Sequence, residues 1–134
     1  MASEPDVVVA RPGVPEYERL VLAEKRHRYC VAVFAINEGD RLRNQLAAMA
    51  PLADRIDIVV ADGGSTDGSL APDSLGEFRL RALLVKRGPG RLSAQMRMAI
   101  AFVLDEGYDG MVVIDGNGKD VLDAMPRMIE LLDA

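Results

Sequence analysis

Short apolar stretches alternate along the chain with segments whose apolar residues recur at helical spacing. The apolar stretches have strand length and predict four buried strands, at residues 29–36, 56–61, 82–85 and 111–114. Helical spacing predicts helices at residues 40–49, 92–104 and from about 121 to 132, and the second gathers Met96, Ile100, Val103 and Leu104 on one face. Strands that alternate with helices in this way predict an α/β fold with a mostly parallel sheet flanked by helices.

The first 28 residues have a different pattern. Three prolines and a glycine within residues 1 to about 15 predict a flexible or loosely attached lead. Between residues 16 and 28, Leu20, Val21 and Ala23 are placed to form the inward side of a short helix. We therefore expect an N-terminal lead over residues 1–28, followed by one domain over residues 29–134.

Composition narrows the class of protein. A chain of 134 residues is one ordinary domain, and 49% hydrophobic with 28% charged residues is a globular balance. A net charge of −5 argues against a general nucleic-acid binder, which needs a basic surface. No apolar stretch has the length of a membrane span, and the N-terminus lacks a signal-peptide pattern. We expect no nucleic-acid partner, no transmembrane segment and a cytoplasmic location, free or peripheral at the membrane.

Two residue types with reactive side chains occur once each. Cys30 begins an apolar strand, which predicts a buried structural thiol. His27 lies within a cluster of basic residues and has no neighbour for a catalytic triad or a zinc site, so we expect a surface residue.

The most informative segment is the loop that follows the second predicted strand. Apolar residues end abruptly there, and the loop Asp62-Gly63-Gly64-Ser65-Thr66-Asp67-Gly68-Ser69 begins. Asp62 can accept hydrogen bonds from a base or sugar, or it can cap a turn of its own loop. Because Asn37, Asp62 and Asp115 each follow a strand's carboxyl end, we expect all three on one rim of the sheet. A nucleotide or sugar site is the first hypothesis.

This loop has companions before and after it, namely Ala35-Ile36-Asn37-Glu38 and Ile114-Asp115-Gly116-Asn117. In this order the three segments resemble the inverting family 2 glycosyltransferases with the GT-A fold, from about residue 30 to the C-terminus. That family has a strand ending near Tyr-Asn-Glu, a Val-Asp-Asp-Gly-Ser-Thr-Asp-Gly loop and an Asp-x-Asp metal motif. The resemblance implies a GT-A-like, Rossmann-like fold that binds a nucleotide-diphospho-sugar donor for transfer of the sugar to a hydroxyl of a lipid or saccharide acceptor.

The resemblance also implies roles for residues of the first two segments. Asp62 matches the family residue that contacts the nucleotide base. Asn37 and Glu38 match the family's Asn-Glu and would organise the loop, although a helix N-terminal turn explains the same residues. Ile36 stands where the family has Tyr, and Gly63 where many relatives have a second Asp, so the base preference does not carry over.

A basic segment lies between the second and third of these motifs. Residues 79–97 hold six cations and no acidic residue in an acidic chain, which indicates an anion site. Arg91 follows a Gly-Pro-Gly turn into a predicted helix N-terminus and aligns with a basic residue that reaches the diphosphate in similar enzymes. We expect Arg79 and Arg81 to belong to a solvated face.

The last motif departs from the family at its second acidic position. Asp115 keeps the register of Asp-x-Asp, but Asn117 replaces the second Asp, and Lys119 and Asp120 follow. Either Asp115, Asn117 and Asp120 hold Mg²⁺ or Mn²⁺, or Lys119 takes over part of the metal's work on the departing diphosphate. A purely structural loop is the third alternative.

Similar transferases supply the catalytic base from a half that follows the Asp-x-Asp strand, whereas this sequence ends one helix after the motif. No residue can be assigned as the base; if the chain does turn over, Asp67, Asp120 and Asp123 are the carboxylates to consider. We therefore hold two hypotheses, a glycosyltransferase in fragment or minimal form and a noncatalytic nucleotide-sugar-binding or assembly module. A sugar-nucleotide pyrophosphorylase should have a Gly-x-Gly-x-Arg loop after its first strand, and none is present.

Overall fold

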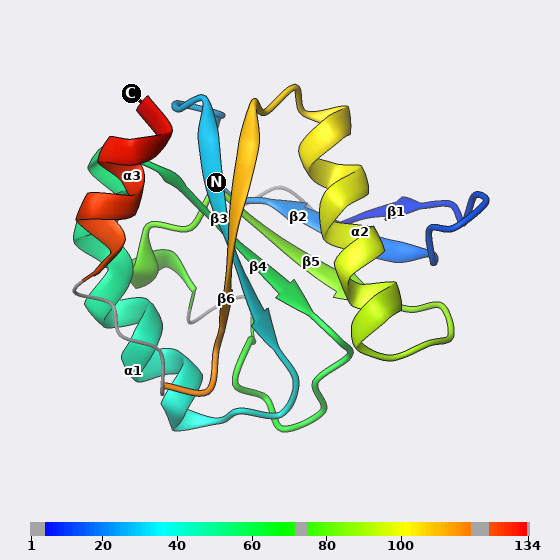
Figure 1. Ribbon diagram of the computed structural model, residues 1–134. Coiled ribbons are helices and arrows are strands. Elements are labelled where there is room, and N and C mark those ends of the chain that lie inside the picture. The colour runs from blue at the N-terminus through cyan, green and yellow to red at the C-terminus, as the bar shows by residue number, and fades with distance from the viewer. Residues whose placement is uncertain (1–4, 72–74, 119–123, 134) are drawn as a thin grey trace.

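The computed structural model of the protein describes residues 5–71, 75–118 and 124–133. Within them a six-stranded sheet is flanked by helices (Figure 1). The strands are β1 (Asp6–Val8), β2 (Tyr17–Val21), β3 (Tyr29–Ala35), β4 (Asp57–Asp62), β5 (Ala82–Lys86) and β6 (Gly110–Asp115). The helices are α1 (Asp40–Met49), α2 (Leu92–Asp105) and α3 (Met125–Asp133), with short 3₁₀ helices η1 (Ala50–Asp54) and η3 (Gly76–Phe78).

The sheet is mixed, with strand order β1-β2-β5-β4-β3-β6. Strands β5, β4, β3 and β6 are parallel to one another, whereas β2 is antiparallel to both β5 and β1. The predicted α/β class is confirmed. The expectation of a mostly parallel sheet holds for the segment from β5 to β6 and not for the N-terminal strands.

The predicted helix over residues 16–28 is wrong. Residues 17–21 form β2, which pairs along its whole length with β5, and β1 pairs with β2 in turn. The chain reverses between them at a turn where Gly13 has a φ of 79°. Five residues are too few for helical and strand periodicity to be told apart, and the free edge of β5 decides in favour of the strand.

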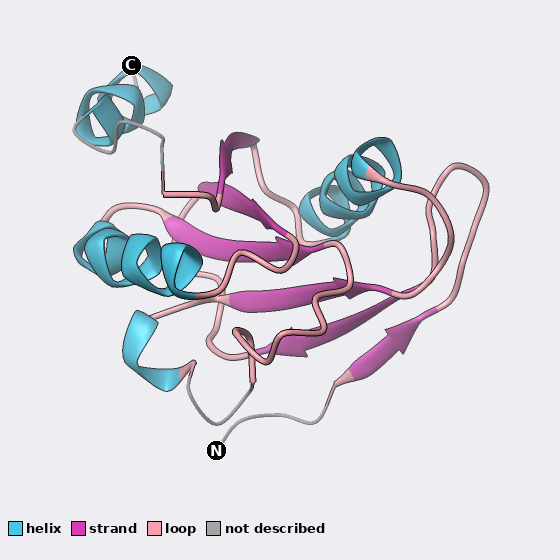
Figure 2. Ribbon diagram, turned by 90° about the horizontal axis from the view of Figure 1, so that it is seen from below, coloured by secondary structure: helices cyan, strands magenta, loops and turns pink. Residues whose placement is uncertain are grey.

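Apolar side chains pack on both faces of the sheet. Along β3, Val31 and Val33 belong to the core under α1 and α3, whereas Cys30 and Ala32 belong to the core under α2. Figure 2 shows the helices on the two sides of the sheet. Burial raises the pKa of the Cys30 thiol to about 12, and the prediction of a buried structural cysteine is confirmed.

The buried side of α2 differs from the predicted one. Val103 is buried and Met96 partly buried, as predicted, but Ile100 and Leu104 are exposed. The other residues that α2 turns towards the sheet are Met98, Phe102 and the polar Gln95. Small alanines on that side let the helix lie close to the sheet, which an apolar count does not capture.

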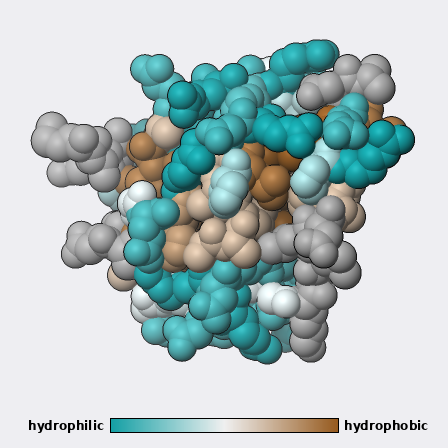
Figure 3. Space-filling view, turned by 90° about the vertical axis from the view of Figure 1, so that its left-hand side faces the viewer, coloured by the Kyte–Doolittle hydropathy of each residue, from teal (hydrophilic) through white to brown (hydrophobic). Residues whose placement is uncertain are grey.

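On the opposite face, α3 contributes Met125 and Ile129 to the core shared with α1, while residues 121–123 of the predicted last helix lie outside the described residues. The side of the molecule seen in Figure 3 has hydrophobic residues across its middle, bordered by hydrophilic ones. No helix within the described ranges has the length and apolar character of a membrane span.

Candidate functional site

The four parallel strands end at one edge of the sheet, which we call the carboxyl rim; it comprises residues 36–39, 62–69, 87–91 and 115–118. Strand β3 lies between β4 and β6, so the chain leaves β3 on one side and returns on the other. Loops diverge at such a switch point and leave a crevice. Asn37, Asp62 and Asp115 all lie on this rim, as expected.

The carboxylate of Asp62 accepts hydrogen bonds from its own loop. The residue is only 2% exposed. Its Oδ2 accepts hydrogen bonds from the backbone N–H groups of Gly64 and Ser65, at 3.2 and 2.8 Å, and its Oδ1 accepts one from the Ser65 hydroxyl at 2.5 Å. The second role foreseen for Asp62, capping the turn, is what the geometry shows. Contact with a base stays a prediction.

Asn37 joins the loop after β3 to the loop after β4. Its Oδ1 accepts hydrogen bonds from the N–H groups of Thr66 and Asp67, at 2.7 and 3.2 Å, and its own N–H donates to the Ser65 hydroxyl at 2.8 Å. The residue has a φ of 49°, a left-handed conformation that asparagine tolerates better than most residues. Together with Asp62, Asn37 fixes the shape of both loops.

Asp67 and Glu38 tie the rim to the start of α1. Asp67 accepts hydrogen bonds from Gly39 N–H at 3.1 Å and from the hydroxyl and N–H of Ser69 at 2.6 and 3.0 Å. These bonds, the Ser69 hydroxyl first among them, lower the pKa of Asp67. Glu38 forms an ion pair with Arg41 at 3.0 Å. Both carboxylates therefore organise the loop and helix start.

Two buried glutamines that the sequence analysis did not single out form hydrogen bonds with backbone groups at the rim. Gln95 of α2 donates from Nε2 to the carbonyl oxygens of Ala35 and Ala61, at 3.1 and 2.6 Å, and so bridges β3 and β4. Gln45 of α1 donates from Nε2 to the Asp115 carbonyl and accepts from Gly118 N–H, both at 2.8 Å. A polar residue on the buried side of a helix is the signal that could have found them, but for α2 the predicted buried side was only partly right and did not include Gln95.

Gly63 lies between Ile36 and Gln95, where a side chain has little room. A Cβ atom at position 63 would lie 3.2 Å from Gln95 Oε1 and 3.4 Å from Ile36 Cδ1. The absence of a second Asp after Asp62 thus has a steric reason in this chain. Ile36 itself is 53% exposed, so it presents an apolar surface on the rim.

A cavity of about 360 Å³ opens beside the rim at the ends of β4 and β5. The residues that line it include Asp62, Ser65, Thr66, Val85 and Arg87. Its size is that of a small-molecule site.

Arg91 stands at the N-terminal end of α2, which begins at the same end of the sheet (Figure 1). Its side chain is exposed, and no described residue forms a hydrogen bond or ion pair with its guanidinium. The turn before it needs glycine, because Gly90 has a φ of 107° and a Cβ there would lie 2.6 Å from that of Ala94. Arg91 is therefore available to an anion at the rim.

The two cations expected on a solvated face behave differently. Arg79 is exposed and pairs with Asp54 at 2.6 Å, as expected for a surface residue. The expectation for Arg81 is wrong, because it is 7% exposed and pairs with Glu106 at 2.5 Å beneath α2. Arg81 directly precedes the first residue of β5. Its ion pair with Glu106 and its contact with the Phe102 ring explain why it is buried.

The metal prediction is only partly within the described chain. Asp115 Oδ1 accepts a hydrogen bond from Asn117 N–H at 3.0 Å, and the carboxylate and amide oxygens are ligands of the kind that a hard cation takes. Lys119 and Asp120 lie outside the described residues. Within residues 5–71, 75–118 and 124–133, no three His, Cys, Asp or Glu side chains are grouped to hold a metal ion. The metal site stays a prediction.

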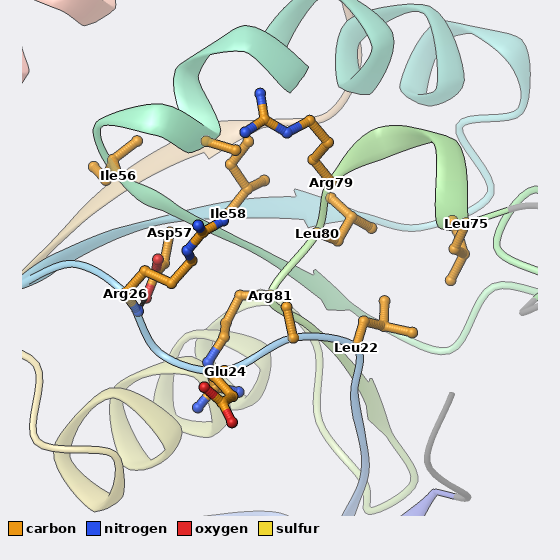
Figure 4. Close-up of a pocket in the computed structure, with 13 residues that line it drawn as sticks. Leu22, Glu24, Arg26, Ile56, Asp57, Ile58, Leu75, Arg79, Leu80 and Arg81 are labelled. Carbon is orange, nitrogen blue, oxygen red and sulfur yellow. Dashed lines mark hydrogen bonds between the residues drawn. The ribbon is translucent and has the colours of Figure 1, made fainter. Parts of the chain in front are cut away.

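A second cavity, of about 400 Å³, lies at the opposite edge of the sheet, where β4 and β5 begin (Figure 4). None of the predicted site residues lines it, and Arg26, Asp57 and Arg79 are among those that do. His27 lies at this edge as well, half-buried rather than on the surface, with Nε2 2.9 Å from the Ala53 carbonyl oxygen. The chemistry-bearing loops therefore stand apart from this cavity.

Comparison of the chain with models of protein families, with curated proteins and with solved structures finds no match.

Proposed function

We propose that the carboxyl rim binds a nucleotide-diphospho-sugar donor and that the chain is the donor-binding part of a glycosyltransferase. The observation that carries the proposal is the network in which Asn37, Ser65 and Asp62 lock two rim loops at the switch point of the sheet. Hydrogen bonds within the protein hold Asn37 in its left-handed conformation, so the loop is organised for binding by its own residues.

The neighbouring groups suit a donor of this chemistry. Arg91 would form charge-assisted hydrogen bonds with the diphosphate, beside the first N–H groups of α2. The cavity beside Asp62 and Thr66 has space for the sugar or nucleoside part. Asp115 and Asn117, with Asp120, would hold a divalent ion that neutralises charge on the departing diphosphate, unless Lys119 supplies that charge.

One observation favours the noncatalytic alternative for this chain by itself. The carboxylates of Asp62 and Asp67 both accept hydrogen bonds from their own loop. The lowered pKa makes Asp67 a weaker base than an ordinary aspartate, which is the opposite of what deprotonating a hydroxyl requires. We therefore expect donor binding without rapid transfer.

The binding test is calorimetric titration with UDP, GDP and their sugars. We expect binding, and a loss of about 1.5 to 3 kcal/mol in the Arg91→Ala variant, the contribution of a charge-assisted hydrogen bond. Arg55→Ala is the matched control, because it removes the same charge from an exposed residue at the opposite edge of the sheet. No heat and no thermal shift at ligand concentrations up to about a millimolar would refute the proposal.

The turnover test uses the same purified chain with donor and acceptor. Positioning of the acceptor and removal of its proton each contribute large factors to the rate, so we expect hydrolysis and transfer to be absent or very slow. Rapid transfer would show that a base lies within this chain.

A further inference from the structure

The side-chain amide of Gln95 has only one chemically sensible orientation. Its terminal nitrogen faces two carbonyl oxygens, of Ala35 and Ala61, which can only accept hydrogen bonds. Both donors of the amide are therefore directed into the fold, and Oε1 is fixed as the remaining acceptor. No described group donates a hydrogen bond to Oε1, and the atom is not fully enclosed by protein, so solvent can reach it.

Gln45 provides the comparison within the same molecule. Its nitrogen donates to a rim carbonyl and its oxygen accepts from Gly118 N–H, so both ends of the amide are occupied by protein. Gln95 is equally enclosed, at 6% exposed, yet only its nitrogen has partners. A buried polar residue with one unpaired acceptor gains free energy when a ligand supplies the missing donor.

The surroundings of Oε1 indicate what kind of donor fits. The atom lies beside Gly63, whose missing side chain leaves the approach open, and the exposed Ile36 side chain lies next to the same glycine. A flat ring could pack against Ile36 while an N–H on its edge points at Oε1. The Asp62 carboxylate, by contrast, already accepts hydrogen bonds from its own loop.

We propose that Gln95 Oε1 accepts a hydrogen bond from a ring N–H of the nucleotide base, so that the rim selects uracil or guanine over cytosine or adenine. The inference rests on the proposed nucleotide-diphosphate function and adds the class of base. Uracil and guanine carry a protonated nitrogen at the centre of their pairing edge, whereas cytosine and adenine have an acceptor there, which would face the acceptor Oε1.

The first test changes only the ligand and uses the unmodified protein. Calorimetry compares UDP with N3-methyl-UDP and with CDP, and GDP with N1-methyl-GDP. Each methyl group removes the ring donor, so we expect the methylated ligands and CDP to bind at least about tenfold more weakly than the better of UDP and GDP. Equal affinity for each methylated ligand and its parent would overturn the inference.

The second test closes the approach to Oε1. Gly63 does not have a positive φ, so Gly63→Ala keeps an allowed backbone and should fold, but its methyl group would lie against Oε1. We expect the preference for UDP over N3-methyl-UDP to shrink to less than about threefold. Gly76→Ala is the matched control, since a Cβ there meets nothing within 4 Å and φ is not positive. A Gly63→Ala variant that keeps the full preference would contradict the inference.

The outcomes also separate this inference from the function on which it rests. Binding of nucleoside diphosphates without discrimination at the ring nitrogen leaves the function standing and removes the role of Gln95. No binding of any nucleoside diphosphate by the folded protein removes both.

Discussion

Strand β4 begins and ends with a buried aspartate, and the two carboxylates do different work. Asp57, 4% exposed, accepts hydrogen bonds from the Tyr108 hydroxyl at 2.6 Å and from the N–H of Arg26 at 3.1 Å. It joins segments far apart in the chain. Asp62, 2% exposed, accepts hydrogen bonds, among the described residues, from Gly64 and Ser65 of the loop that follows it.

The same side chain therefore stabilises the packing of distant segments at one end of the strand and fixes the conformation of a loop at the other. Burial and the Asp57 carboxylate raise the pKa of Tyr108, so its hydroxyl stays a donor at all ordinary pH values. At the rim, the carboxylate replaces backbone partners that a loop of glycines and hydroxyl residues cannot provide for itself. A change at Asp57 should therefore lower the free energy of unfolding of the whole fold, and a change at Asp62 should loosen one loop.

Replacement of Asp57 should have the largest effect. Asp57→Ala leaves the buried Tyr108 hydroxyl and the part-buried Arg26 N–H without this acceptor, and we expect a loss of about 2 to 4 kcal/mol in the free energy of unfolding. Urea denaturation measures it, with the exposed Asp54→Ala as control. A loss no larger than that of the control would show that Asp57 does not stabilise the edge of the sheet where β4 and β5 begin.

Replacement of Asp62 should lower stability less than replacement of Asp57, and it should also lower nucleotide affinity. In Asp62→Ala the loop keeps its bonds to Asn37 but loses its own cap, so we expect a smaller loss of stability, about 1 to 2 kcal/mol. Nucleotide affinity should fall by at least about tenfold, because a disordered loop must be reordered on binding. Calorimetry and urea denaturation on the same sample measure both. Unchanged affinity would mean that the loop takes no part in the site.

Alkaline pH should lower stability through Cys30, which lies beside Asp57 at the edge of the sheet opposite the carboxyl rim. The pKa of Cys30 is raised to about 12, above the ordinary value of 9.0, because burial disfavours the thiolate. A raised pKa in the folded state means that this stabilisation is complete below pH 9 and is lost as pH rises from there towards 12. Urea midpoints of the protein and of Cys30→Ala should therefore converge above pH 9. Parallel pH curves for the two proteins would contradict the assignment to Cys30.

Acid should act on the rim instead. The pKa of Asp67 is lowered by the Ser69 hydroxyl and N–H, so the bonds of this carboxylate stabilise the loop above the ordinary value of 3.8 and are lost as pH falls below it. Acid slows the intrinsic exchange of every amide, so the measured quantity is the protection factor, which corrects for this. The protection factors of the Gly39 and Ser69 amides should fall on acidification before those of the β4 amides do. The Asp67→Asn variant should show faster exchange already at neutral pH.

The smallest effect concerns the third rim loop. If Asp115 and Asp120 hold a divalent ion despite Asn117, chelator should lower nucleotide affinity, and Asn117→Asp should tighten metal binding because a carboxylate replaces an amide. If nucleotide binding is unchanged by chelator but lost in Lys119→Ala, the lysine rather than a metal ion stabilises the diphosphate. Calorimetry with and without chelator distinguishes the two cases.

The hydrophobic pattern by itself determined the core of the fold. Each of the predicted strands from residue 29 onwards forms within a residue or two of its predicted bounds, because a run of apolar residues bounded by loop residues has few other ways to be buried. The order of strands and helices then placed Asn37, Asp62 and Asp115 on one rim, since parallel strands end on the same edge.

Tertiary structure alone decided the N-terminal strands, the buried side of α2 and the partner of each polar side chain. Residues 17–21 became a strand because β5 offered an edge, which no local pattern records. The bond between Asn37 and Ser65 spans 28 residues, and those from Gln95 to Ala61 and Ala35 span 34 and 60. Hydrogen bonds between residues so far apart depend on where the sheet brings the chain together, so the sequence shows which residues can bond but not to which partner.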